Sequence, residues 1–194
     1  MTSGFNGYIL AGGRSSRMGS DKGLLQLGET TLIGHVIRSI EETVSNLFII
    51  SSNPGHRNYD LTLIPDIIAG KGPAGGILTA LEHSSVPFNF IVSCDTPFIR
   101  PQTITILMQK HGEFDITLPE VNGYPEPLCG IYSTSCAVKW RDVMTGGKLK
   151  LTDLISCFRY QLVPLTELNG GDKDEFFNIN NVEDYTKALN KFHQ

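Results

Sequence analysis

The segment that decides the fold lies near the start of the chain, directly after a short apolar run at residues 7–10. It reads Leu10-Ala11-Gly12-Gly13-Arg14-Ser15-Ser16-Arg17-Met18-Gly19-Ser20-Asp21-Lys22. Consecutive glycines permit backbone conformations that other residues avoid, and they let amide groups approach a ligand closely. Arg14, Arg17 and Lys22 add three cations against one acid, Asp21. This order of strand, glycines and cations predicts a triphosphate-binding loop, with a glycine turn and solvated charges as the simpler alternative.

Outside this loop, short β-branched runs alternate with longer amphipathic ones. Strands are predicted at residues 7–10, 47–51, 61–65, 88–93, 114–118, 128–132 and 160–163, and helices over 32–44, after the glycine-rich segment 70–76, from Pro101, over 135–144 and 150–157, and after an N-cap at Asn181. Strands that alternate with helices indicate a mostly parallel sheet with helices on both faces. At 194 residues, the chain is expected to form one compact domain over residues 1–194.

Two carboxylates follow strands whose ends should meet at one edge of the sheet. The loops after Leu10, Pro65 and Ser93 lie at the carboxyl ends of predicted strands, which is where parallel sheets bind ligands. Asp95, in the last of these loops, is well placed to hold Mg²⁺, because this ion prefers hard oxygen ligands and bridging phosphates. Asp66 follows Pro65 in the same way. A turn-initiating role is the alternative for both aspartates.

Other motifs exclude several familiar chemistries. The P-loop pattern Gly-x-x-x-x-Gly-Lys-Ser/Thr is absent, which disfavours ATPase or GTPase activity of that kind. Residues 70–75 do spell Gly-x-Gly-x-x-Gly, but residues 66–69 separate them from the preceding strand. We interpret them as a second backbone wall near the base or ribose, with a turn ahead of a helix as the alternative. The five histidines form no recognisable catalytic motif and are expected to be surface or core residues.

Composition sets limits on partners and location. Hydrophobic residues make up 40% of the chain and charged residues 19%, as in ordinary soluble proteins. The formal net charge of -4 argues against broad nucleic-acid binding. The four cysteines lack metal-ligand spacing and suit a reducing compartment. Since neither a signal segment nor a membrane-spanning run is visible, we expect a cytoplasmic protein that binds neither nucleic acid nor a membrane.

The opening segment closely resembles the signature of molybdenum cofactor guanylyltransferases, at Leu10-Ala11-Gly12-Gly13, Ser15, Arg17-Met18-Gly19 and Asp21-Lys22. The resemblance continues in order across nearly the whole chain, through Gly23-Leu24-Leu25, Pro73-Ala74-Gly75-Gly76, Cys94-Asp95-Thr96-Pro97, Pro127-Leu128-Cys129 and Phe177-Asn178-Ile179-Asn180. Cytidylyl-transferring relatives typically read Leu-Ala-Ala-Gly at the first motif. Gly12 at that place therefore favours a purine nucleotide.

The resemblance implies a GT-A-like, Rossmann-like three-layer α/β fold, and transfer of GMP from GTP to the terminal phosphate of Mo-molybdopterin with release of pyrophosphate. It also implies roles for residues at the matching positions. The nucleotide and its phosphates would be held by Leu10, Ala11, Gly12, Gly13 and Lys22. Asp66 would lie near the guanosine, Asp95 would ligate Mg²⁺, and Asn178 and Asn180 would lie on the pterin side.

Two places depart from the pattern of the relatives. Where relatives present an asparagine to the nucleotide, this chain has Ser51-Ser52-Asn53, which makes Asn53 the candidate. Lys148 and Lys150 stand where some relatives have paired arginines. A lysine contacts an anion as a point charge and not as a fork, and an exposed basic helix end is the alternative for this pair.

The predicted mechanism uses Arg17, Lys22 and Asp95 as its catalytic residues. An acceptor that is already a phosphate needs no general base, but it needs positioning and relief of charge repulsion. The alternatives are a cytidylyltransferase for the same cofactor, a sugar- or alcohol-phosphate nucleotidyltransferase, and a non-catalytic GTP sensor. Exchange with molybdenum-insertion proteins or apo-molybdoenzymes is implied by the resemblance alone.

Overall fold

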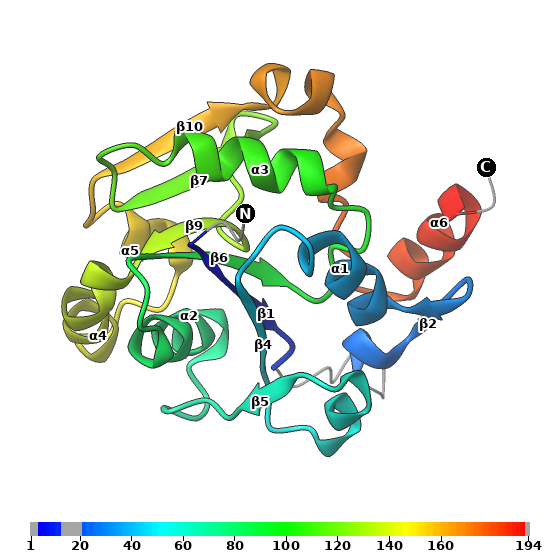
Figure 1. The fold of residues 1–194 in the computed structure, drawn as a ribbon, viewed down its shortest axis with the longest axis horizontal. Helices are drawn as coiled ribbons and strands as arrows, with labels where there is room; N and C mark the ends of the chain where they lie inside the picture. Colours follow the sequence, from blue (N-terminus) through cyan, green and yellow to red (C-terminus); the bar gives the residue numbers. More distant parts are fainter. Residues whose placement is uncertain (1–3, 13–20, 193–194) are drawn as a thin grey trace.

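A mixed β-sheet forms the centre of the molecule (Figure 1). The computed structural model describes residues 4–12 and 21–192. The large sheet contains β1 (Asn6–Leu10), β4 (Asn46–Ile50), β5 (Thr62–Ile64), β6 (Phe88–Ser93), β7 (Ile116–Val121), β8 (Tyr124–Pro125), β9 (Cys129–Ser133) and β10 (Tyr160–Pro164). Their order is β10-β7-β9-β6-β1-β4-β5, with β8 paired to β7. The strands β6, β1, β4 and β5 are parallel, as are β7 and β10, whereas β9 runs antiparallel between β6 and β7.

Helices cover both faces of this sheet, as predicted. One face carries α1 (Leu32–Ile40) and α3 (Pro101–Lys110), and the other carries α2 (Gly72–His83), α4 (Ala137–Thr145) and α5 (Leu151–Ile155). Alternate residues of a strand point to opposite faces. Ile9 of β1 therefore packs into the α1 and α3 side, while Tyr8 and Leu10 pack into the α2 and α4 side. The fully buried Trp140 ties α4 to α2, since its indole N–H donates to the Ala74 carbonyl at 3.0 Å. The three-layer α/β architecture is confirmed.

The strand register brings the carboxyl ends of the parallel strands to one level. Leu10 at the end of β1 is paired with Ile50 of β4 on one side and with Ser93 of β6 on the other. Ile50 is in turn paired with Ile64 at the end of β5. The loops that follow these four strands consequently start side by side at one edge of the sheet.

The helix α2 begins earlier than the sequence predicted. It starts at Gly72, inside the segment 70–76 that was expected to be a loop. Proline is compatible with the first turn of a helix, and Pro73 occupies that place. A Cβ added to Gly76 would lie 3.2 Å from the Leu10 side chain. This glycine therefore serves the close approach of helix and sheet and not loop flexibility.

Other element boundaries differ by a few residues. The helix predicted over 32–44 ends at Ile40. The strand predicted at 114–118 runs over Ile116–Val121 and continues into a hairpin with β8.

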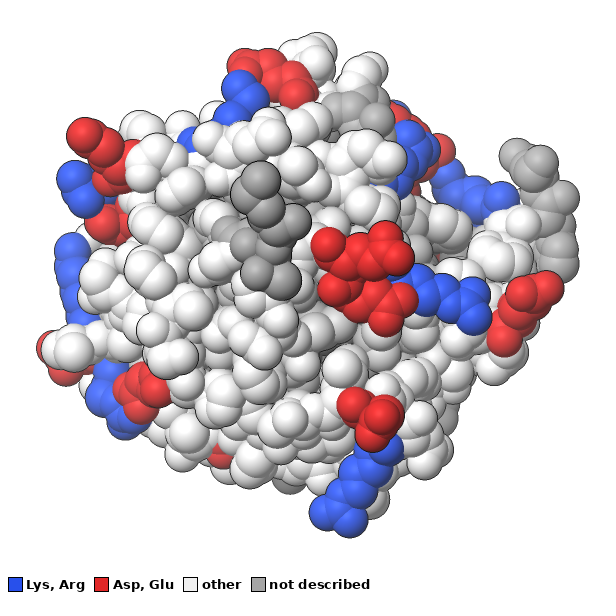
Figure 2. Space-filling view, viewed as in Figure 1, with Lys and Arg blue, Asp and Glu red and all other residues white. Residues whose placement is uncertain are grey.

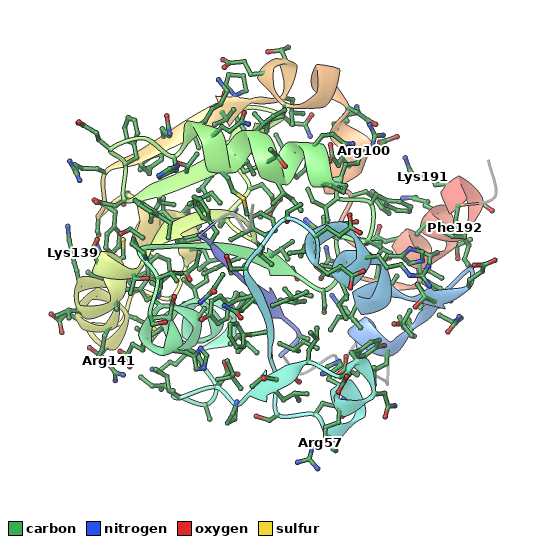
Figure 3. The ribbon with its side chains drawn as sticks, in the orientation of Figure 1. Arg57, Arg100, Lys139, Arg141, Lys191 and Phe192 are labelled. Carbon is green, nitrogen blue, oxygen red and sulfur yellow. The ribbon has the colours of Figure 1, made fainter. Side chains whose placement is uncertain are left out.

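A small unit beside the main sheet was not predicted as a whole. The hairpin of β2 (Gln26–Leu27) and β3 (Thr30–Thr31) packs against α6 (Val182–Phe192), as Figure 1 shows. Phe192 extends from α6 (Figure 3), and a Cβ added at Gly28 would overlap its ring. The predicted N-cap is confirmed, because the Asn181 side chain accepts a hydrogen bond from the Asp184 amide at 2.9 Å. This unit connects the segment after Lys22 with the segment before α6.

The surface carries charges of both signs. On the face drawn in Figure 2, acidic and basic side chains lie close to one another at several places and the central area is mainly uncharged. Among the helices of residues 4–12 and 21–192, none combines the length and the apolar character that crossing a membrane requires.

Candidate active site

A cavity of about 770 Å³ opens at the carboxyl edge of the sheet, next to the ends of β1, β4 and β5. Its walls come from strand ends, from the loop after β5 and from the first turn of α2. The lining residues are Leu10, Gly12, Ile50, Asp66, Ala69, Gly70, Gly72, Pro73 and Gly76. The volume is typical of a site for a small molecule. Segment 70–76 therefore contributes a second part of the wall, in addition to Leu10 and Gly12.

Gly12 and Asp66 meet in the wall of this cavity. A Cβ at Gly12 would lie 3.3 Å from Asp66 Oδ2, so a larger residue at position 12 would press against this carboxylate. Burial raises the pKa of Asp66. Ala11 lies beneath the lining, because its side chain is buried and its N–H donates to the Ile50 carbonyl at 3.0 Å. The cavity thus combines an apolar and glycine-rich wall with one carboxylate.

Lys22 and Asp95 form a second part of the site. Lys22 starts a 3-10 turn (Lys22–Leu24), and its Nζ lies 3.5 Å from Asp95 Oδ2 and 3.0 Å from Asn180 Oδ1. Asp95 follows the end of β6, and its side chain is only 15% exposed. The backbone N–H of Ile179 donates to the Asp95 carbonyl at 3.0 Å. This bond brings the Phe177–Asn180 motif to the end of β6.

In this part of the site, the side-chain amide of Asn178 both accepts and donates a hydrogen bond. Thr96 Oγ1 donates to Asn178 Oδ1 at 2.8 Å, and Asn178 Nδ2 donates to Glu126 Oε2 at 3.4 Å. Burial raises the pKa of Glu126, and hydrogen bonds from the Leu128 N–H and Asn178 offset this only in part. Glu126 was missed by the sequence reasoning. The signal that could have found it is its place directly before the matching Pro127-Leu128-Cys129 motif.

We call the side chains of Lys22, Asp95, Glu126, Asn178 and Asn180 the transfer cluster. Four of its five members were predicted from the sequence. They come from positions that are up to 158 residues apart. Lys22 contacts Asp95 and Asn180, Asn178 contacts Glu126, and the Ile179 N–H, which donates to the Asp95 carbonyl, brings the two groups together.

The remaining predicted residues lie elsewhere or outside the described part. Asn53 contacts Asp21, to which its Nδ2 donates at 2.6 Å, and it caps the 3-10 helix Pro54–Tyr59. Gly13 and Arg17 lie outside the described residues. Lys148 Nζ lies 3.6 Å from Cys157 Sγ, and the exposed Lys150 faces Asp153 at 4.0 Å.

The donor set fits a magnesium ion that is completed by substrate. Within residues 4–12 and 21–192, there is no group of three or more His, Cys, Asp or Glu side chains that could hold a metal by itself. Mg²⁺ is usually bound by one or two carboxylates together with phosphates and water. The carboxylate of Asp95, beside the phosphate-binding candidate Lys22, matches this mode.

A glycine-lined cavity at the carboxyl edge of a parallel sheet, with a lysine–aspartate pair at the end of the neighbouring strand β6, is typical of enzymes that bind nucleotides. Comparison with known proteins defines the class further. Residues 7–159 match the model of the family described as "MobA-like NTP transferase domain". The chain belongs to this family and is a nucleotidyltransferase.

Two relatives and one solved structure illustrate the similarity. A protein of Flavobacterium johnsoniae named "Probable molybdenum cofactor guanylyltransferase" is 35% identical, over 89% of this chain and 96% of its own length. A protein of the same name from Clostridium perfringens (strain ATCC 13124) is 32% identical, over 94% of this chain and 95% of its own. The crystal structure of molybdopterin-guanine dinucleotide biosynthesis protein A from Archaeoglobus fulgidus has a TM-score of 0.83 at 24% identity, over 96% of this chain and 98% of that one. The last comparison shows the shared fold.

Proposed function

We propose that this chain is a molybdenum cofactor guanylyltransferase. It transfers GMP from GTP to the terminal phosphate of Mo-molybdopterin and gives the guanine dinucleotide form of the cofactor and pyrophosphate. The observation that carries this proposal is the position of Lys22, between Asp95 and Asn180. A lysine held there can bind a nucleotide triphosphate at the border between a nucleotide cavity and an acceptor site.

The nucleotide occupies the cavity in this proposal. The base and ribose lie between the Gly12 side and the wall formed by the start of α2, with the Asp66 carboxylate close to the guanosine. The backbone of residues 10–13 and the cations Arg17 and Lys22 hold the phosphates. Asn53 contributes through Asp21, because its amide donates to that carboxylate.

Transfer is an in-line displacement at the α-phosphorus. A terminal phosphate oxygen of the acceptor forms the new bond to the α-phosphorus, and the bond from that phosphorus to the bridging oxygen of pyrophosphate breaks. Lys22 and Arg17 stabilise the charge that develops on the leaving pyrophosphate. Asp95 would hold Mg²⁺, which when bound reduces the repulsion between the anionic reactants. Because the attacking group is already an anion, no side chain has to remove a proton from it.

The acceptor lies on the side of Asn178 and Asn180. Asn180 faces Lys22, and Asn178 is fixed between Thr96 and Glu126. A pterin rich in hydrogen-bonding groups suits such a polar surface. We propose that molybdenum-insertion proteins or apo-molybdoenzymes exchange substrate and product at this side by transient contacts.

Nucleotide binding tests this proposal. The affinities of GTP, CTP and ATP are measured by calorimetry in the presence of Mg²⁺, with wild-type protein and with the Asp66→Asn variant. We expect GTP to bind most tightly, and we expect the advantage of GTP over ATP to shrink in the variant. Tighter binding of CTP than of GTP would contradict the guanylyl assignment and favour a cytidylyltransferase.

A further inference from the structure

His56 is a buried histidine behind the segment that carries Lys22. Its side chain is fully buried in the 3-10 helix Pro54–Tyr59. Its Nδ1 lies 2.7 Å from Ser51 Oγ, and its Nε2 lies 3.5 Å from Asp21 Oδ1. Within the described residues, Nε2 has no hydrogen-bond partner at ordinary distance. A buried polar nitrogen without a hydrogen-bond partner lowers the stability of the fold, so its presence calls for an explanation.

Ser51 on one side and the Asp21 carboxylate on the other favour one arrangement of the His56 ring protons. Ser51 Oγ accepts a hydrogen bond from the Asn53 backbone N–H at 3.0 Å. The hydroxyl proton is then available as the donor to His56 Nδ1. In this tautomer Nε2 carries its own proton and directs it toward the Asp21 carboxylate, which is the arrangement that best satisfies the network.

Asp21 connects this network to Lys22. Its Oδ1 accepts from the Gly23 N–H at 2.9 Å and thereby caps the 3-10 turn that Lys22 begins, while Asn53 Nδ2 donates to Oδ2 at 2.6 Å. The packing is close, since a Cβ added at Gly23 would lie 3.3 Å from both Asp21 Oδ1 and His56 Nε2. Burial raises the pKa of Asp21, but the facing His56 imidazole, the Asn53 amide and the Gly23 N–H together outweigh burial and lower the pKa. Asp21 is therefore an anion directly beside the phosphate-binding lysine.

We propose that His56 is a positioning residue that fixes Lys22 for phosphate binding by acting through Asp21. This inference rests on the proposed function. The imidazole holds the carboxylate in the orientation that caps the turn, and the turn directs Lys22 Nζ toward Asp95 and Asn180. The Nε2–H also screens the negative charge of Asp21, which would otherwise repel a triphosphate. His56 itself does not touch the substrate.

The test compares three histidine variants. His56→Leu removes both polar nitrogens, while His56→Gln retains an acceptor for Ser51 and a donor for Asp21. His111→Gln is the matched control, because His111 packs on Phe5 and Phe88 at the end of α3. Affinities for inorganic triphosphate and for GTP, kcat and KM are measured, and circular dichroism verifies the fold.

We expect His56→Leu to weaken triphosphate affinity roughly tenfold, which is the size of effect typical of a lost hydrogen bond to a charged group. His56→Gln should recover most of this loss, and His111→Gln should bind like wild type. A folded His56→Leu variant with wild-type triphosphate affinity and KM would overturn the proposal. So would equal losses in the Leu and Gln variants, because they would indicate a packing role alone.

Further variants separate positioning from general destabilisation. In an Asp21→Asn background, where the facing charge is absent, His56→Leu should cost much less affinity than in wild type. Equal costs in both backgrounds would contradict action through Asp21. The milder Ser51→Ala change should also weaken triphosphate binding, by a smaller factor, and wild-type affinity in this variant would overturn the assigned network.

Inorganic triphosphate has no base, and its binding needs no acceptor. If the protein binds it and shows the expected differences but transfers no GMP, the guanylyltransferase proposal fails while the role of His56 stands. Failure of wild-type protein to bind triphosphate would overturn the role of His56.

Discussion

The two parts of the site are built in different ways. The cavity proposed for the nucleotide is made by neighbouring strand ends and by the start of α2, and much of its wall is backbone and glycine. The transfer cluster is made by side chains from distant segments. Lys22 is held by Asn180 and Asp95, and Asn178 is held by Thr96 and Glu126.

This difference implies that substitutions in the two parts of the site have different consequences. A cavity whose shape follows from sheet register tolerates loss of one side chain and responds mainly by a change in nucleotide affinity. A cluster of interlocked polar side chains depends on every member, because removal of one leaves others with unsatisfied groups. Substitutions in the cavity should therefore change nucleotide binding, and substitutions in the transfer cluster should change the rate of transfer or the use of the acceptor.

The largest effect is expected for Asp95→Ala. The variant loses the carboxylate that would hold the metal and leaves Lys22 without this ion-pair partner, so kcat should fall by about 10²–10³. The melting temperature should remain close to that of wild type, because the residue is at a strand end. Asp172→Ala, which removes an exposed ion pair with Arg100, is the control and should retain full activity. Near-normal turnover in a folded Asp95→Ala variant would refute the metal assignment.

Asp66→Asn should change affinity more than rate. Replacing the carboxylate is expected to weaken GTP binding roughly tenfold with little change in kcat at saturation. Asp60→Asn is the matched control, because Asp60 is exposed and has a φ of 53°, a conformation that asparagine tolerates. Calorimetry measures both affinities, and a larger loss in kcat than in affinity would remove Asp66 from the nucleotide side.

The same substitution should stabilise the protein in a pH-dependent way. Burial raises the pKa of Asp66 in the folded state, so the folded protein binds this proton more tightly than the unfolded chain does. The ionised carboxylate therefore lowers the free energy of unfolding at neutral pH, and this loss is recovered as the pH falls through the raised pKa. Asp66→Asn should raise the melting temperature at pH 7, with a smaller gain in acid. An equal gain in melting temperature over wild type at neutral and at acidic pH would contradict the burial of this group.

A smaller and more selective effect is expected for Asn178→Ala. The change removes the amide that joins Thr96 to Glu126, so KM for the acceptor should rise about fivefold while GTP affinity stays unchanged. Asn190→Ala, at an exposed position of α6, is the control. Steady-state kinetics with varied acceptor concentration measure this KM. Weaker GTP binding in Asn178→Ala would contradict the assignment of Asn178 to the acceptor side.

The smallest effect is expected for Arg141→Ala. Arg141 projects from α4 (Figure 3), and its guanidinium forms two hydrogen bonds with Glu82, at 2.7 and 2.6 Å. Exposed ion pairs contribute little to stability, and this one connects α4 with α2 at the surface. Nucleotide affinity and kcat should both equal those of wild type. A change in either would show that the helix layer behind the cavity influences catalysis.

The two parts also differed in how well they could be predicted. The apolar run at 88–93 and the glycine-rich segment after Leu10 are local signals, and they correctly indicated the sheet and the edge at which the cavity opens. The start of α2 was placed too late, because the glycines of segment 70–76 resemble a loop, although α2 already begins at Gly72 and Gly76 serves close packing on Leu10. The β2–β3 hairpin was missed because two-residue strands give no periodic signal.

Glu126 and His56 could not be assigned from local sequence. Their importance depends on what reaches them from elsewhere, Asn178 in one case and Asp21 in the other. Asn178 and Asn180 were found through the resemblance to a family, and not through their own chemistry. Side-chain networks between distant segments leave no spacing pattern by which a sequence can be searched.

The proposed reaction transfers a nucleotide from the cavity to an acceptor at the transfer cluster. Its most direct test is pyrophosphate release by the wild-type protein from GTP and from CTP, each with and without Mo-molybdopterin. We predict rapid release from GTP only when the acceptor is present, and much slower release from CTP. Release from CTP at an equal or higher rate, or no acceptor-dependent release from either nucleotide, would contradict the proposal.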